Sequence, residues 1–434
     1  MLEQLTSRVW AGIVAMKSRG LLQVIVSNLV QQAVAFLTVL LIARLLSPSD
    51  FAQVRIALAY VSVATVIASG GLTAPILRYC ADNRYDVDER RMLLGIGLKR
   101  LVWISFATVL FLLVLVLIRN RYSGDAFILG VYALQLPGLA VSTLLLVYLQ
   151  AIQQFRILAL FQVIIRTVAL LVTVAATYVY GLMGFLGASL LMAYLTCLPF
   201  WFASRPTFPS KKPFNIIIPH DFKRLAVYSV FGTLVTSIGQ YSDLMILDVA
   251  GVKKGDVAAY SLATIFFFAL MAFGGAVQGV ATPAFTALID QPKEFKRQLI
   301  RWTAMLSAAS LPAAFFSVAL AFAVEHLFLG TKYAGLGLIL IVLMIKLCLW
   351  STYAVGGAAL VGIGAIRQGS WIAVVTTTVA VVVGYPMCLQ FGIFGAAWTQ
   401  VILAAISAGC VWWVIVIEIR ALQERVLTSG KALN

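Results

Sequence analysis

Long apolar stretches that carry polar residues on one face dominate the chain, and the clearest runs from Leu225 to Tyr260. Polar residues 4, 3, 4 and 3 positions apart form one stripe on a helix: Ser229, Thr233, Thr236, Gln240 and Asp243. The 23 residues from Leu225 to Leu247 hold a single charge, and they are long enough to cross a hydrocarbon core of about 30 Å. This pattern predicts a membrane-spanning helix with one polar face.

Two interpretations of the polar stripe remain open. Serine, threonine and glutamine often hydrogen-bond between membrane helices. A carboxylate within a span is costly, however, and usually faces water or a cation. Asp243 therefore favours a transport pathway.

The same apolar pattern recurs along the whole chain. Hydrophobic residues make up 62% and charged residues 11%, against about 45–50% and about 25% in soluble domains. We predict an all-α polytopic membrane protein with twelve transmembrane helices: 22–45, 53–74, 101–118, 126–149, 157–180, 184–203, 225–247, 257–282, 302–324, 335–356, 369–389 and 393–417.

Three pairs of short motifs link the two halves at offsets of 206, 208 and 211 residues: Asp50 with Asp256, Gly71–Pro75 with Gly279–Pro283, and Gly181–Gly184 with Gly392–Gly395. They predict two six-helix repeats. Because six is even, the repeats are parallel, and such folds place the substrate in a central cavity between the halves. The expected division is an amphipathic N-terminal helix at 1–20, a lobe at 21–203, a linker at 204–224, a lobe at 225–419 and a tail at 420–434.

The net charge of +16 follows a topological pattern. With both termini in the cytoplasm, 23 of the 32 lysines and arginines fall on the inner side and seven on the outer side. This asymmetry fits the positive-inside rule, so the charge needs no nucleic-acid partner. We expect a multi-pass protein of the bacterial cytoplasmic (inner) membrane.

Several motifs resemble a known family. Arg44–Phe51 is similar to the R-x-L-x-P-x-D-[FY]-G signature of polysaccharide flippases, the O-antigen and exopolysaccharide exporters of the multidrug/oligosaccharidyl-lipid/polysaccharide superfamily, although Ala52 replaces the glycine. Further similarities follow in order along the chain: Gln240–Leu247, Asp256–Tyr260, Phe328–Ala334 and Phe391–Ala397.

The resemblance implies two lobes around a cavity that opens alternately to each side. It also implies the substrate, a saccharide on undecaprenyl pyrophosphate that is turned from the inner to the outer leaflet. Some relatives place sodium ligands on span eleven, where this chain has Thr376, Thr377 and Thr378. The coupling ion, H⁺ or Na⁺, therefore stays open, and we expect no cofactor.

Two cations lie about ten residues inside predicted spans, Arg166 in span five and Lys346 in span ten. A lone intramembrane cation costs at least about 2.5–3.5 kcal/mol, so each should face a cavity or a partner. We expect both to face one cavity and bind the pyrophosphate, beside the amides of Gln162, Asn28, Gln32 and Gln240. The alternative is a structural pair with a carboxylate such as Asp243, which is also a candidate for ion coupling or for pairing with Arg44 or Arg55.

The remaining residues point to no other chemistry. The five cysteines have no metal or disulfide spacing, and neither histidine has metal partners at a useful spacing. No nucleotide-binding loop is recognisable, which favours a transporter over an enzyme. A drug antiporter of the same superfamily and a membrane polysaccharide polymerase are the alternatives. We expect a monomer that interacts with membrane lipids, with a polymerase and other assembly proteins as candidate partners.

Overall fold

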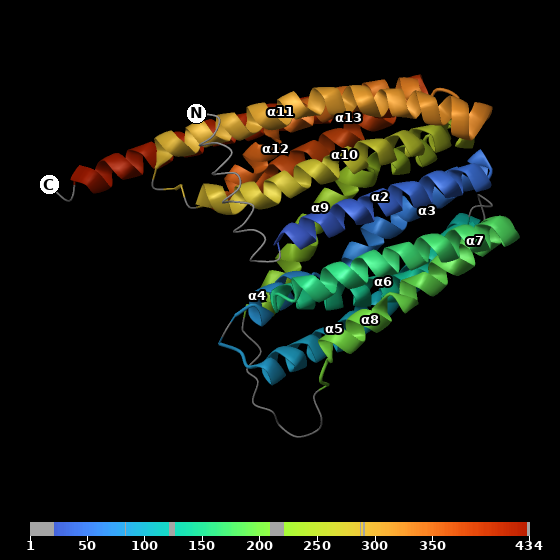
Figure 1. The fold of residues 1–434 in the computed structure, drawn as a ribbon, viewed down its shortest axis with the longest axis horizontal. Helices are drawn as coiled ribbons and strands as arrows, with labels where there is room; N and C mark the ends of the chain where they lie inside the picture. Colours follow the sequence, from blue (N-terminus) through green and yellow to red (C-terminus); the bar gives the residue numbers. More distant parts are fainter. Residues whose placement is uncertain are drawn as a thin grey trace. The chain divides into compact units, whose positions relative to one another are not determined.

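The computed structural model describes residues 21–82, 84–120, 126–208, 221–286, 288–289 and 291–431. All secondary structure in these ranges is helical (Figure 1), which confirms the prediction of an all-α protein. The predicted amphipathic helix at 1–20 lies outside the described residues, as does most of the predicted linker.

The chain folds into two compact units. The first comprises Met1–Leu46 and Ala57–Ser237, and the second comprises Ser47–Ile56 and Ile238–Asn434. These units differ from the predicted lobes in two places, because 47–56 belongs to the second unit and 225–237 to the first. The reason is that helices α3 (Pro48–Ala68) and α9 (Phe222–Val249) each run without interruption from one unit into the other.

In the first unit, α6 packs against α4, α5, α7 and α8, and α2 packs along α7 (Figure 1). The helix bounds are α2 (Leu21–Leu45), α4 (Thr73–Cys80), α5 (Val87–Asn120), α6 (Ala126–Ala151), α7 (Phe155–Leu195) and α8 (Cys197–Ser204).

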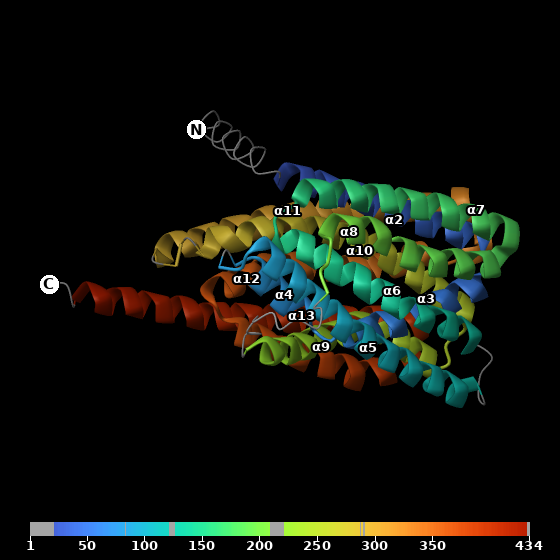
Figure 2. The same cartoon turned by 90° about the horizontal axis from the view of Figure 1, so that it is seen from below.

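In the second unit, α12 is the central helix, with α10, α11 and α13 against it (Figure 2). The bounds are α10 (Lys254–Thr286), α11 (Pro292–Ala323), the π-helix η1 (Val324–Leu329), the 3₁₀-helix η2 (Gly330–Tyr333), α12 (Leu336–Ile363) and α13 (Ile366–Lys431).

Eight helices among the described residues are long and apolar enough to cross a membrane. Two of them, Phe155–Ser204 and Arg367–Glu424, each contain two of the predicted spans. The predicted spans 22–45 and 225–247 are not among the eight. The protein is thus a multi-pass membrane protein, and the count of twelve stays a prediction.

One of the predicted repeat motifs has the same local geometry in both halves. Gly181 in α7 and Gly392 in α13 interrupt their helices with φ 59°, ψ −137° and φ 56°, ψ −130°. Three residues later, Gly184 and Gly395 each meet the backbone carbonyl eight positions earlier, so closely that a Cβ would lie 2.0 Å from its oxygen. Glycine adopts the positive φ of Gly181 and Gly392 without strain, and its lack of a Cβ permits the close approach at Gly184 and Gly395.

A second motif pair does not share its local structure. Gly71 lies in a turn before α4 with φ +63°, whereas Gly279 lies inside the continuous helix α10. Short glycine- and proline-containing matches of this kind recur by chance in apolar sequences. The two-repeat layout as a whole stays a prediction.

Two of the motifs that carry the family resemblance meet within the second unit. Ser47 caps α3 by accepting the N–H of Asp50 at 3.1 Å, and its hydroxyl donates to the Asp50 carboxylate at 2.7 Å. Phe51, which follows, packs edge-on against Tyr333 at 5.9 Å between ring centroids, and both rings are fully buried. These contacts hold the start of α3 in the second unit.

Candidate functional site

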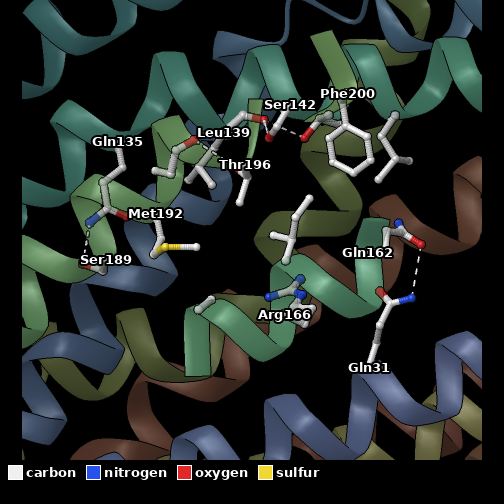
Figure 3. Close-up of a pocket in the computed structure, with 15 residues that line it drawn as sticks. Gln31, Gln135, Leu139, Ser142, Gln162, Arg166, Ser189, Met192, Thr196 and Phe200 are labelled. Atoms are coloured by element: carbon white, nitrogen blue, oxygen red, sulfur yellow. Dashed lines mark hydrogen bonds between the residues drawn. The ribbon is translucent and has the colours of Figure 1, made fainter. Parts of the chain in front are cut away.

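The first unit contains a groove of about 330 Å³ between α2, α6, α7 and α8 (Figure 3). Its wall combines amides and hydroxyls with apolar side chains such as Leu139, Ile165 and Phe200. The polar residues on the wall are Gln31, Gln135, Ser142, Thr143, Gln162, Arg166, Ser189 and Thr196.

The kink at Gly181 gives the groove two walls from one helix. The part of α7 before the kink contributes Gln162 and Arg166, and the part after it contributes Ser189 and Met192. A straight helix would carry these two sets of side chains about 40 Å apart, at about 1.5 Å per residue. The glycine-directed turn therefore makes the groove possible.

Two hydrogen bonds fix the amides on the groove wall. The Nε2 atom of Gln31 donates to Oε1 of Gln162 at 3.2 Å, which joins α2 to α7. The Nε2 atom of Gln135, which is buried, donates to Oγ of Ser189 at 2.9 Å. Each amide keeps further donor and acceptor capacity for a polar molecule in the groove.

Arg166 is the one charged residue among the described residues of this wall, and its side chain is exposed (Figure 3). Within the part of the chain that the structure describes, its guanidinium has no hydrogen-bond or ion-pair partner. The group offers five N–H donors in a planar fork that matches phosphate and carboxylate oxygens. Such a group can bind an anion.

The structure separates the substrate-binding residues predicted from the sequence. Arg166 and Gln162 line the groove together. Gln32 is exposed and absent from the groove wall, where its neighbour Gln31 stands instead. Gln240 is exposed on the part of α9 in the second unit, and the side chain of Asn28 lies outside the described residues.

The polar stripe on α9 also divides. Thr233, Thr236 and Gln240 are exposed, but Asp243 is buried, with 9% of its surface accessible. The hydroxyl of Tyr260 on α10 donates to its Oδ2 atom at 2.6 Å. Asp243 is thus buried within the second unit, unlike the three exposed residues of the stripe.

Lys346 on α12 also belongs to the second unit, whereas Arg166 belongs to the first. Its ammonium donates to Oε1 of Gln400 at 2.7 Å. The expected cavity shared by Arg166 and Lys346 therefore stays a prediction. Among the described residues, no group of three or more histidine, cysteine or acidic residues could hold a metal ion.

Sequence reasoning missed the residues that α6 brings to the groove. Gln135, Leu139, Ser142 and Leu146 follow one another at intervals of 4, 3 and 4 positions, the spacing of a single helix face. This face of α6 alternates polar and apolar residues, unlike the stripe on α9, whose members are all polar. Span four carries no charge that would set this face apart.

Comparison with known proteins agrees with the resemblance seen in the sequence. The family model described as "Polysaccharide biosynthesis protein" matches residues 40–338. A search of curated protein sequences finds no significant match.

Among solved structures, the chain is similar to the lipid II flippase MurJ in an inward closed conformation, with a TM-score of 0.70 and 14% identity over 93% of this chain and 90% of that one. It is also similar to an inward-facing multidrug resistance MATE family transporter of the MOP superfamily, with a TM-score of 0.68 and 15% identity over 91% and 96%. A third similar structure is a MOP superfamily transporter from Pyrococcus furiosus, for which a reverse polarity of the binding pocket suggests a different function, with a TM-score of 0.66 and 14% identity over 93% and 96%.

Proposed function

The chain belongs to the polysaccharide biosynthesis protein family, and we propose that it is a flippase for undecaprenyl-pyrophosphate-linked oligosaccharides. It moves these units from the inner to the outer leaflet by alternating access, for O-antigen, capsule or exopolysaccharide synthesis. It works in the bacterial inner membrane with both termini in the cytoplasm. In this proposal the protein is a transporter with no resident cofactor.

The observation that carries the proposal is the guanidinium of Arg166 in the groove of the first unit, which has no partner among the described residues. Pyrophosphate is the charged part of the proposed substrate, and Arg can hold two of its oxygens with two parallel N–H···O bonds. Among the described residues that line the groove there is no carboxylate to compete with the anion.

The neutral groups of the groove fit the rest of the substrate. The Gln31–Gln162 pair lies on the same wall as Arg166 and offers amide donors and acceptors to sugar hydroxyls. Leu139, Ile165 and Met192 supply apolar surface for the non-polar faces of a sugar ring. The fold shared with a lipid II flippase supports a lipid-linked substrate.

The same fold is shared with multidrug transporters, so a drug antiporter is the second candidate. The charge of the groove separates the two candidates. A cationic drug would be repelled by Arg166, because like charges in a low-dielectric site disfavour each other. The groove therefore favours the anionic substrate.

The test is leaflet turnover in liposomes that contain the purified protein and an undecaprenyl-pyrophosphate saccharide with a labelled sugar. A membrane-impermeant probe reports the sugar that reaches the outer leaflet. We expect turnover by the wild type and at least about a tenfold lower rate for Arg166→Ala, because a charge-assisted hydrogen bond is worth about 1.5–3 kcal/mol and each 1.4 kcal/mol is a factor of ten.

The matched control is Arg156→Ala, which removes an exposed guanidinium near the start of the same helix and away from the groove. We expect this variant to turn over the lipid at the wild-type rate. Equal loss in both arginine variants would reject the groove as the anion site. Exchange of a cationic dye for protons, without any lipid turnover, would instead identify a drug antiporter.

A further inference from the structure

A group of cationic side chains lies at one end of the first unit, where α4 and the starts of α5 and α9 come together (Figure 1). The turn before α4 packs tightly on both neighbours. A Cβ on Gly71 would lie 2.1 Å from the carbonyl oxygen of Ala226 in α9, and a Cβ on Gly70 would lie 2.6 Å from Cδ1 of Ile104 in α5. Five cationic side chains on these three helices form what we call the basic cluster: Arg78, Lys99, Arg100, Lys223 and Arg224.

Two stacked aromatic rings hold part of the basic cluster in place. Tyr79 of α4 and Phe222 of α9 stack with 6.0 Å between their ring centroids and 18° between their planes. Arg78 lies over the first ring, with its Cζ atom 5.7 Å from the centroid, and Arg100 lies over the second ring at 5.9 Å. Contact with a ring face holds a guanidinium without using its N–H groups. Both arginines are thus positioned while their hydrogen-bond donors stay available.

The basic cluster lies where apolar stretches of the chain begin. Two of its pairs directly precede such stretches: Lys99–Arg100 before 101–118, which holds no charged residue, and Lys223–Arg224 before 225–247. The ends of membrane spans lie at the level of the lipid headgroups, where lysine, arginine and tyrosine are enriched. The phosphates of the surrounding lipids are therefore within reach of these side chains.

The charge of this region is positive. The segments that carry the basic cluster, residues 73–100 and 221–228, hold eight lysines and arginines and five acidic residues. Two of these acidic residues are bound to cations outside the cluster: Asp82 to Arg84 at 2.7 Å, and Asp88 to Arg91 at 3.5 Å. In the part of the chain that the structure describes, no member of the cluster forms an ion pair. All members except Arg100 are exposed, so the positive charge faces the surroundings.

We propose that the basic cluster is a binding site for the phosphate groups of anionic phospholipids in the surrounding membrane. Groups of about four to eight lysines and arginines next to a membrane helix are typical of sites for anionic headgroups. A guanidinium can hold a phosphate with two parallel N–H···O bonds, and an ammonium adds a compact point charge. A headgroup bound there links α4, α5 and α9 at the membrane surface. The site is separate from the groove, because none of the five residues lines the groove.

The test is the binding of phospholipid to the purified protein in detergent, measured by native mass spectrometry as the dissociation constant of the first bound lipid. We expect the wild type to bind phosphatidylglycerol, whose headgroup carries a net negative charge, at least about tenfold more tightly than zwitterionic phosphatidylcholine. Lys99→Gln/Lys223→Gln should weaken phosphatidylglycerol binding about twentyfold, because each cation near an anionic headgroup contributes a factor of about five. Both lysines are exposed, so this variant should unfold at the temperature of the wild type.

The matched control is Arg156→Gln/Lys293→Gln, which removes the same charge from exposed positions at the starts of α7 and α11, outside the basic cluster. We expect this variant to bind phosphatidylglycerol with the affinity of the wild type. Equal weakening in both double variants, or equal affinity of the wild type for the two lipids, would overturn the proposed site.

A further arm separates the lipid headgroup from a free anion. Inorganic phosphate, added at constant ionic strength, should leave the bound phosphatidylglycerol in place, because the proposed ligand is a lipid held at the membrane surface. Displacement of the lipid would identify a site for the free anion instead. Lipid binding needs no transport substrate, so a failure of the proposed flippase activity leaves this result unchanged.

Discussion

The buried carboxylate of Glu325 offers the sharpest test of how the second unit is stabilised. It lies in the π-helix η1 with 8% of its surface accessible. Its two oxygens accept the backbone N–H groups of Gly335 and Gly337, each at 2.9 Å, at the start of α12. The carboxylate thus satisfies donors that a helix N-terminus leaves free, next to the positive end of the helix dipole.

The expected magnitude follows from these two bonds. A hydrogen bond to a charged group contributes about 1.5–3 kcal/mol, and a buried donor left without an acceptor costs about 1–3 kcal/mol. Glu325→Ala removes both acceptors at once, so the free energy of unfolding should fall by about 3–5 kcal/mol. Glu325→Gln retains one acceptor oxygen and should lose about half as much.

The assay is thermal unfolding of the purified protein in detergent. The unfolding temperature should decrease in the order wild type, Glu325→Gln, Glu325→Ala. Leu327→Ala, two residues away, is the control, because that side chain is 87% exposed and makes no hydrogen bond. A Glu325→Ala protein that unfolds at the temperature of the wild type would refute the role of this carboxylate as the cap of α12.

Two further predictions address the kink and the groove. Gly395→Ala should lower stability far more than Gly409→Ala, because a Cβ at Gly395 would lie 2.0 Å from the carbonyl oxygen of Met387, whereas at Gly409 it would meet nothing within 4 Å. Equal unfolding temperatures of the two variants would show that the kink in α13 accommodates the Cβ without cost. In the liposome assay, Gln31→Leu should slow lipid turnover and Gln32→Leu should not, because only Gln31 lines the groove and bonds Gln162; the reverse order would place the substrate elsewhere on α2.

The sequence predicts helices and intramembrane charges well, because both depend on local composition. Arg166 stands out for that reason, and the groove contains it together with Gln162. The choice between Gln31 and Gln32 is a matter of about 100° of rotation around α2. Packing against α7 decides it, and no local pattern encodes that packing.

The sequence does not predict the hydrogen-bond partners of Asp243 either. Tyr260 lies 17 residues away on the next helix. It is an aromatic residue outside the polar stripe of α9, so the stripe does not indicate it. The start of α3, Ser47–Ile56, belongs to the same unit as Asp243, and the order of the spans along the chain does not predict this.

The two units treat the charges of Asp243 and Arg166 in opposite ways. In the second unit, both carboxylate oxygens of Asp243 accept hydrogen bonds from the protein, one from Tyr260 and one from the backbone of Leu244. In the first unit, Arg166 has no partner among the described residues and stays exposed in a polar groove. A cation in a membrane span is costly unless it faces a cavity or a partner, so the exposed guanidinium of Arg166 suits the anion-binding role that we propose for it.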